Sequence, residues 1–349
     1  MNRRRPFGSN GREMKAATKP GITRTDVIIL VAVALALAAA VLFVVRSDLF
    51  GGRGPGFSPE FSFGEQPRRI PRELVKYEKV LTIPTGFSAA GALAVDSQDR
   101  IYVAGDRAVR VWDSAGKRLR MDVAGLKGEP RCLAVDKDGR MYLGMGSDVQ
   151  VYSPAGVLER ALPRYAEEGV VTRVVLDPKG IFVAVHKSIA SGFVIQYDLS
   201  GKLQKVITLS DAKLVSRFLD VAATSDGLRV TNPGAVETGR IRVYGYDGAL
   251  SYGWGDYDTK GDLNNLSGCC NPVHLAALPD GRIVTSEKGA QVIVKVYHRD
   301  TPDDYGRVES VVAELQGAEG LDLAVDSRQR ILVLDTNASA VYVFKRTGE

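Results

Sequence analysis

Apolar and polar residues alternate over short stretches of this chain, and turn residues interrupt the alternation at regular intervals. At residues 132–143, the run Cys-Leu-Ala-Val is followed by Asp-Lys-Asp-Gly and then by a second run, Arg-Met-Tyr-Leu. This pattern predicts two strands joined by a tight hairpin, because Asp-Gly adopts the positive φ angles that the turn needs. Five similar segments begin at Leu93, Val174, Val221, Leu275 and Leu323. The chain therefore contains six copies of one structural repeat.

The spacing of the copies matches the size of a propeller blade. The position that follows the first predicted strand is occupied by Asp96, Asp136, Asp177, Thr224, Leu278 and Asp326. Neighbouring copies are offset by 40, 41, 47, 54 and 48 residues, and most carry a second aromatic run and a glycine turn. Four short strands in about 45 residues are typical of one blade. We therefore predict an all-β fold, a six-bladed β-propeller.

A single strand is predicted just before the first copy, at residues 74–84. The chain ends after the third strand of the sixth copy, so that copy lacks a fourth strand. The early strand would supply it, and both ends of the chain would then close the ring without leaving an open sheet edge. The propeller is therefore expected to occupy residues 74–349.

The repeated order of small and apolar residues, Asp, a Gly turn and an Ile-Tyr-Val run resembles the NHL-repeat family of six-bladed β-propellers. The resemblance covers roughly residues 85–349, and it departs from the family pattern at Thr224 and Leu278, where the Asp is replaced. NHL propellers bind protein, RNA or small molecules, or catalyse lyase and hydrolase reactions. The resemblance thus implies the fold, and the function has to be inferred from the site residues.

An uncharged apolar run occupies residues 27–45 and, as a helix, would cross the hydrocarbon core of about 30 Å. Seven Lys and Arg residues precede it, which places the N-terminus in the cytoplasm. We predict a single-pass protein of the inner or plasma membrane: a cytoplasmic tail (1–26), a transmembrane helix acting as a signal anchor (27–45), a flexible Gly- and Pro-rich linker (46–73) and a periplasmic or extracellular propeller. A cleaved signal peptide is the alternative, but no small-residue cleavage site lies clear of the apolar run.

The net charge argues against nucleic acid as a partner. The whole chain carries +5, but residues 1–46 alone carry +6, so the remainder is close to −1. A nucleic-acid-binding propeller needs a basic face of its own. We therefore expect no nucleic-acid binding.

Candidate site residues come from aligning the copies at the start of the first strand. The equivalent positions are Ala92, Cys132, Arg173, Asp220, His274 and Asp322. In a closed ring these residues would surround one mouth of the central channel, with Cys132 opposite His274 and Arg173 opposite Asp322. Charged and reactive side chains are rarely left alone in a packed core. We therefore predict ligand binding by Arg173, Asp220, Asp322 and Asn271, the last from the long loop before the fifth copy, and we assign no catalytic residue.

All three cysteines of the chain, Cys132, Cys269 and Cys270, are expected near this mouth together with His274. Three interpretations remain open. The thiolates and the imidazole could hold a transition metal such as Zn²⁺ or Cu⁺, or an Fe–S cluster. Alternatively, Cys269 and Cys270 form a vicinal disulfide in an oxidising compartment, or all three cysteines are inert packing residues. The cofactor is therefore left unassigned.

Two classes of function remain. In the first, a membrane-tethered binding or scaffold module presents its top face to a protein partner or small ligand, since tethering raises the local concentration near a membrane complex. In the second, a metal-dependent, lactonase-like hydrolase uses Asp220, His274 and Asp322 to hold an ion, while Arg173 positions an anionic group. Because the six positions mix soft and hard ligands, no single ion is favoured, and we prefer the binding module to the enzyme.

Overall fold

The computed structural model describes Val31, Val33 and residues 68–348, apart from residues 120–121, 166–168, 189–190, 210–217, 232–238, 259, 268–270, 290, 300–303 and 316–320. The chain separates into two compact units, Met1–Gly56 and Phe57–Glu349. Val31 and Val33, the two described residues of the first unit, are helical and exposed. No helix within the described residues is long and apolar enough to cross a membrane, and the rest of the predicted span at 27–45 lies outside them.

The second unit contains six four-stranded antiparallel sheets, which confirms the predicted six-bladed β-propeller. Blade 1 consists of β2 (Ala90–Val95), β3 (Ile101–Gly105), β4 (Ala108–Trp112) and β5 (Val123–Ala124). Blade 2 consists of β6 (Cys132–Val135), β7 (Met141–Met145), β8 (Asp148–Tyr152) and β9 (Leu158–Ala161). Blade 3 consists of β10 (Val170–Asp177), β11 (Gly180–Ser188), β12 (Ser191–Tyr197) and β13 (Leu203–Thr208). Blade 4 consists of β14 (Asp220–Thr224), β15 (Gly227–Thr231), β16 (Ile241–Tyr244) and β17 (Leu250–Trp254). Blade 5 consists of β18 (His274–Ala277), β19 (Ile283–Glu287), β20 (Val292–Tyr297) and β21 (Val308–Leu315). Blade 6 consists of β22 (Asp322–Val325), β23 (Ile331–Asp335), β24 (Ala340–Arg346) and β1 (Tyr77–Pro84).

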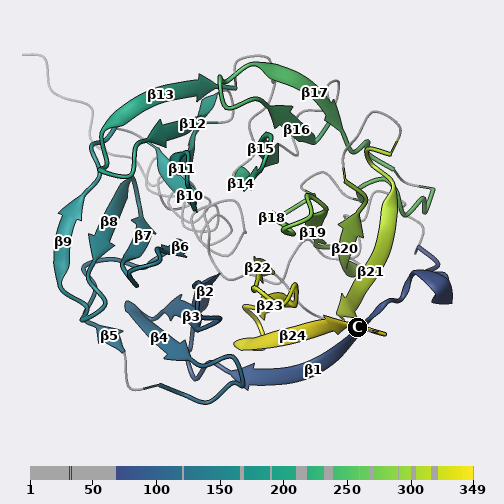
Figure 1. The fold of residues 1–349 in the computed structure, drawn as a ribbon, viewed down its shortest axis with the longest axis horizontal. Coiled ribbons are helices and arrows are strands. Elements are labelled where there is room, and N and C mark those ends of the chain that lie inside the picture. The colour runs from purple at the N-terminus through teal and green to yellow at the C-terminus, as the bar shows by residue number, and fades with distance from the viewer. Residues whose placement is uncertain are drawn as a thin grey trace, which may run out of the picture. The chain divides into compact units, whose positions relative to one another are not determined.

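The innermost strands β2, β6, β10, β14, β18 and β22 surround the central axis (Figure 1). Successive blades pack face to face, so side chains on both faces of a sheet are buried, and every residue of β7 and of β19 is buried. Between blades 2 and 3, for example, Val151, Val171 and Val183 share one apolar cluster. The core is thus a series of apolar layers between blades, arranged around the axis.

The repeated aspartate caps the first hairpin of its blade. In blade 2, Asp136 Oδ1 accepts hydrogen bonds from the N–H groups of Asp138 and Arg140 at 2.9 and 2.8 Å. Asp326 accepts the equivalent pair in blade 6. At Gly139 the φ angle is +82°, a conformation that glycine adopts without a steric penalty. The Asp and the Gly of the repeat therefore stabilise the turn.

The first and last strands of the propeller close the ring, as predicted. Strand β1 pairs antiparallel with β24 and completes blade 6. The side chain of Glu309, on β21 of the neighbouring blade, binds Lys76 Nζ at 2.9 Å and Arg346 Nη2 at 2.5 Å. Burial opposes ionisation of Glu309, but the hydrogen bonds from Arg346 and Lys76 prevail and lower its pKa to about 2. Glu309 therefore holds the start of β1 and the end of β24 against blade 5.

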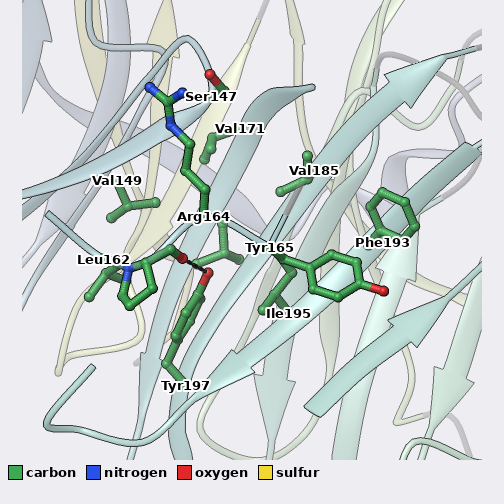
Figure 2. A pocket seen from close by; sticks show the side chains of 12 residues that line it. Ser147, Val149, Leu162, Arg164, Tyr165, Val171, Val185, Phe193, Ile195 and Tyr197 are labelled. Carbon is green, nitrogen blue, oxygen red and sulfur yellow. Dashed lines mark hydrogen bonds between the residues drawn. The ribbon is translucent and has the colours of Figure 1, made fainter. Parts of the chain in front are cut away.

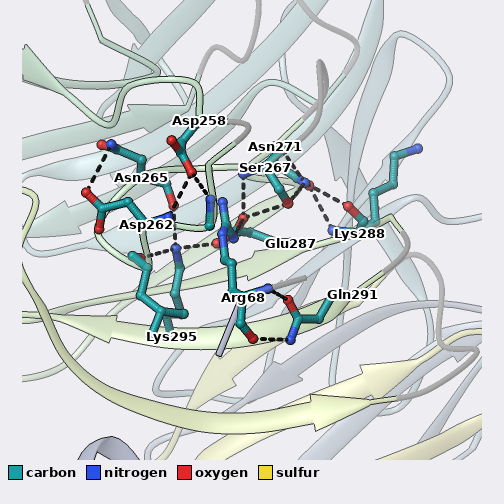
Figure 3. Close-up of polar contacts among 12 residues, drawn as sticks. Arg68, Asp258, Asp262, Asn265, Ser267, Asn271, Glu287, Lys288, Gln291 and Lys295 are labelled. Atoms are coloured by element: carbon teal, nitrogen blue, oxygen red, sulfur yellow. Dashed lines mark hydrogen bonds and ion pairs between the residues drawn. The ribbon is translucent and has the colours of Figure 1, made fainter. Parts of the chain in front are cut away.

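Some described residues that precede this strand were assigned above to the linker. A 3₁₀ helix, η3 (Arg72–Leu74), precedes β1, and Arg68 is 5% exposed. Arg68 Nη1 lies 2.6 Å from Glu287 Oε2, and Glu287 Oε1 lies 2.5 Å from Lys295 Nζ (Figure 3). Burial lowers the pKa of Lys295 to about 8, although Glu287 opposes this shift. Arg68 and η3 therefore contact blade 5.

Lys295 connects this cluster to the long loop before the fifth copy. Its ammonium donates to the carbonyl oxygens of Leu263 and Asn265, both at 2.8 Å. Ser267 N–H donates to Glu287 Oε2 at 2.8 Å. The described part of the loop is therefore held on blade 5 by buried charges.

Candidate functional site

The predicted mouth residues lie at the beginning of the innermost strands. Cys132, Asp220, His274 and Asp322 are the first residues of β6, β14, β18 and β22. Arg173 lies within β10. The structure brings four of these side chains together at the axis: Arg173, Asp220, His274 and Asp322.

Arg173 crosses the axis of the ring. Its Nη1 lies 2.6 Å from Asp322 Oδ1 in the opposite blade, and its Nε lies 3.3 Å from Asp220 Oδ1 in the next blade. Its Nη2 donates to the carbonyl oxygen of Leu323 at 3.1 Å. Arg173 is 9% exposed, Asp322 3% and Asp220 1%. One buried guanidinium therefore links three blades across the channel opening.

Both carboxylates also accept hydrogen bonds from the backbone of the innermost strands. Asp322 Oδ2 accepts from Leu93 N–H of blade 1 at 2.8 Å, and Asp322 Oδ1 accepts from Leu323 N–H at 2.8 Å. Asp220 Oδ2 accepts from Leu275 N–H of blade 5 at 3.2 Å. An innermost strand has one edge without a partner strand, so its N–H groups need other acceptors. The two aspartates thus join neighbouring blades as well as binding Arg173.

His274 forms a dyad with Asp220. Its Nδ1 lies 2.9 Å from Asp220 Oδ2, and its side chain is 24% exposed. Burial disfavours the imidazolium, but the hydrogen bond to Asp220 and the charge of Asp322 outweigh it and raise the pKa of His274. Burial likewise opposes ionisation of Asp220, but Arg173 and His274 hold its pKa below the ordinary value. The dyad therefore favours a charged imidazole beside an ionised carboxylate.

Cys132 points into the core between blades. It is 1% exposed and belongs to the apolar cluster between blades 2 and 3. Its partner in β7 is Gly144, where an added Cβ would lie 2.3 Å from Cys132 Sγ. Burial raises the pKa of the Cys132 thiol to about 12, so the thiolate that a metal would bind is disfavoured. Its surroundings favour the interpretation of Cys132 as a packing residue.

The side chain of Asn271 is occupied by hydrogen bonds to the backbone of its own loop and of Lys288. It is 1% exposed, and its side-chain amide donates to the carbonyl oxygens of Ser267 and Lys288 at 2.6 and 2.7 Å. Its Oδ1 accepts from Lys288 N–H at 2.8 Å. These contacts occupy the polar atoms that a ligand would need. Cys269 and Cys270 lie outside the described residues, so the vicinal disulfide stays a prediction.

The hard-ligand set Asp220, His274 and Asp322 does not fit a divalent cation. A cation would have to lie about 2.0–2.6 Å from the carboxylate oxygens. The Arg173 guanidinium already lies 2.6 and 3.3 Å from those oxygens, and its charge repels a second cation. Within the described residues, no group of three or more His, Cys, Asp or Glu residues could hold a metal ion. The set that includes Cys269 and Cys270 is not tested by this result.

A polar cavity lies at the other end of the innermost strands, where the sequence predicted no site. It measures about 230 Å³, and its lining includes Asp177, Thr224, Ser225, Leu278 and Asp326. Thr224 is four residues beyond Asp220 on β14, which separates the two mouths by about 13 Å of strand. Thr224 and Leu278 are the copies that lost the repeated Asp, so this loss was the available signal. The volume is below the range of about 300–1,000 Å³ typical of small-molecule sites.

A second cavity lies between blades 2 and 3 and is lined mainly by apolar side chains (Figure 2). Val171, Val185 and Phe193 contribute to it, and Tyr197 Oη donates to the carbonyl oxygen of Pro163 at 2.6 Å. Its volume is about 20 Å³, which is room for about one water molecule. We regard it as a packing gap.

Comparison with known proteins shows the fold and no family. No family model matches the chain, and no curated protein matches it in sequence. Among solved structures, a gluconolactonase from Xanthomonas campestris is similar, with a TM-score of 0.56, 16% identity, and coverage of 80% of this chain and 95% of that chain. The WD40 β-propeller domain of Doa1 has a TM-score of 0.48 and 15% identity, and the match covers 74% of this chain and 79% of that domain. At such identity the likeness concerns the propeller fold alone, and NHL membership stays a prediction.

Proposed function

We propose that this chain is a membrane-tethered binding module that presents its propeller, outside the cytoplasm, to a protein partner. The observation that supports this most is the position of the Arg173 guanidinium between Asp220 and Asp322. A site that acts on a substrate needs polar groups that the substrate can engage. Here Arg173 pairs with both carboxylates, and the carboxylates bind the edges of the innermost strands; Arg173 Nε is the one atom of this group that is buried without a hydrogen bond. The mouth therefore stabilises the ring, and binding uses the outer surfaces of the blades.

The partner should remain with the full-length protein. We would isolate the tagged full chain from membranes of its own cells in mild detergent, after cross-linking, and identify the proteins attached to residues 68–348. A protein recovered in about equal amount with the full chain is expected, and a tagged fragment of residues 1–67 should not retain it. Equal recovery with the fragment would contradict a binding role for the propeller.

The membrane tether is a separate part of the proposal. It rests on the uncharged run at residues 27–45 and on the basic residues before it. Alkaline phosphatase folds and is active only outside the cytoplasm. Fused after Glu349, it should therefore be active and sediment with membranes. An inactive fusion would contradict the orientation, and an active fusion in the soluble fraction would indicate cleavage.

A hydrolase is the second candidate, and the His274–Asp220 dyad favours it. A buried carboxylate that holds a partly exposed imidazole is an arrangement used in general acid–base catalysis. The gluconolactonase of similar fold suggests a sugar lactone as the first substrate to test. Hydrolysis by the full chain, lost in His274→Gln and kept in His298→Gln, would replace the binding proposal with an enzyme. We expect no rate above the spontaneous one.

A further inference from the structure

The outermost strands of blades 2 to 5 begin in one common register. Their first residues pair with the last aromatic residue of the preceding strand, as Leu158 with Tyr152, Leu203 with Tyr197, Leu250 with Tyr244 and Val308 with Tyr297. The exposed fractions of these first residues are 41% for Leu158, 39% for Leu203, 41% for Leu250 and 9% for Val308. One aliphatic position is therefore exposed in three blades and buried in the fourth.

In blade 5 this position belongs to an apolar cluster that residues 70–75 and the fifth-blade loop both join, and Asn264 Oδ1 of that loop accepts from Val308 N–H at 2.9 Å. Val75 forms an isolated parallel bridge with Val311 of β21, and Ile70 and Leu74 pack against the apolar cluster that contains Val308. Val75, which directly follows the 3₁₀ helix η3, thus meets the outer edge of the sheet through one backbone bridge. Extended peptides bind exposed sheet edges through backbone bridges in other proteins.

Charge complementarity accompanies this cover. The covering segment is basic, with the sequence Arg-Arg-Ile-Pro-Arg-Glu-Leu-Val-Lys at residues 68–76. The blade beneath it supplies the acids: Arg68 binds Glu287 at 2.6 Å, and Lys76 binds Glu309 at 2.9 Å. Two acids of blade 5, Glu287 on β19 and Glu309 on β21, therefore hold a basic segment that also carries aliphatic side chains.

The outer edge of blade 3 has the same aliphatic position and the opposite charge. Leu199 is 60% exposed and Leu203 39%, and Lys202 and Lys205 lie beside them on the turn and on β13. Arg160 of the neighbouring β9 donates to the carbonyl oxygens of Leu199 and Ser200, which brings its charge to this edge. Figure 1 shows β9 and β13 as successive outermost strands around the periphery.

The acids of this edge are already engaged by other groups. Asp198 Oδ1 accepts from Lys202 N–H at 2.9 Å, and Glu159 lies 3.0 Å from Arg140. Among the described residues, none forms a bridge with the outer side of β13. Lys205 Nζ donates to the carbonyl oxygen of Asp247 at 2.5 Å, a neutral acceptor that leaves its positive charge uncompensated. The edge therefore presents aliphatic side chains beside positive charges.

We propose that the outer edge of blade 3, formed by Leu199, Leu203, Lys202 and Lys205, binds an extended acidic segment of the protein partner that carries aliphatic side chains at alternate positions. This inference rests on the binding function proposed above. A second copy of this chain fits less well, because like charges on two lysine-bearing edges repel each other. The segment would lie along the edge of β13 that is equivalent to the edge of β21 that Val75 meets.

Site-specific photo-cross-linking in the source cells tests the position of the partner. A photoreactive amino acid would replace Leu203 in the full chain, and Tyr257, a partly exposed residue of the fifth-blade loop, in a parallel variant. We expect one protein to be attached at position 203, with the attached peptide acidic and alternately aliphatic. Attachment of that protein only at position 257 would overturn this edge and leave the binding function intact. No attached protein at either position, with none recovered with the full chain, would overturn both.

A charge reversal tests the chemistry of the contact. Lys202→Glu combined with Lys205→Glu should lower the yield of the adduct at position 203 by about tenfold, because two attractive contacts become repulsive. Lys117→Glu is the matched control, because Lys117 has the same place as Lys202 in the turn after the third strand of its blade. Each lysine N–H donates to the aspartate four residues before it. The control should leave the yield unchanged. An unchanged yield in the double variant, or an adduct with a second copy of this chain, would overturn the proposal.

Discussion

Replacing Arg173 by methionine should lower the free energy of unfolding by about 3–4 kcal/mol at pH 7. The side chain contacts Asp322 Oδ1 at 2.6 Å, Asp220 Oδ1 at 3.3 Å and the Leu323 carbonyl oxygen at 3.1 Å. Removing one partner of a buried ion pair typically costs about 3–5 kcal/mol, because the remaining charge is left uncompensated. The lower part of that range applies here, because both carboxylates keep backbone N–H donors and Asp220 keeps His274.

Urea denaturation followed by circular dichroism would measure this loss. Folded domains have total stabilities of about 5–15 kcal/mol, so the predicted loss is a large fraction of the whole. Arg164→Met is the matched control, because Arg164 pairs with Asp148 at the surface and such a pair contributes about 0–1 kcal/mol. If Arg173→Met and Arg164→Met cost the same within about 1 kcal/mol, the buried network does not stabilise the ring as argued.

The pH dependence provides a second check on the same residue. The pKa of Asp220 lies below its ordinary value in the folded protein, partly because of Arg173. Its ionised form therefore adds stability that is fully present above about pH 4 and is lost as the pH falls further. Without Arg173 this contribution is smaller, so the stabilities of Arg173→Met and wild type should converge below about pH 4. A gap that widens towards acid pH would refute the assignment of Asp220 as the partner.

Three further changes test the packing and closure of the ring. Gly144→Ala should lower the free energy of unfolding by about 1–3 kcal/mol in chemical denaturation, because the new methyl group meets Cys132 Sγ. Adding Cys132→Ala in the same chain should restore part of the loss, and no loss in Gly144→Ala would contradict this packing. Glu309→Gln should lower the free energy of unfolding by about 1–2 kcal/mol at pH 7. The difference in stability from wild type should disappear as the pH falls from 4.5 towards 2, because the pKa of Glu309 in the folded protein is about 2, and a difference that persists at pH 2 would contradict this. Removing residues 1–84, and with them β1, should abolish cooperative thermal unfolding, whereas removing residues 1–67 should leave it intact; equal melting of the two truncated chains would refute closure by β1.

The alternation of apolar and polar residues was sufficient to identify the six blades and their closure. Strand residues alternate with a period of two, and Asp-Gly turns such as Asp138-Gly139 mark where each strand reverses, so both signals are local. The copy count and the missing fourth strand of the last copy then required an N-terminal strand. Alignment of the copies also placed Arg173 opposite Asp322, because equivalent residues of a closed ring lie at one height on the axis.

Tertiary structure decided which side chains meet, because such contacts join residues distant in sequence. Cys132 begins an innermost strand, yet its thiol lies between blades because Gly144 on β7 leaves room for it. Arg68 was assigned to a linker from its composition, but Glu287, far along the chain, binds it on blade 5. Composition and spacing predict the local conformation of a segment, whereas its burial and its charge pairing depend on the residues that the fold brings next to it.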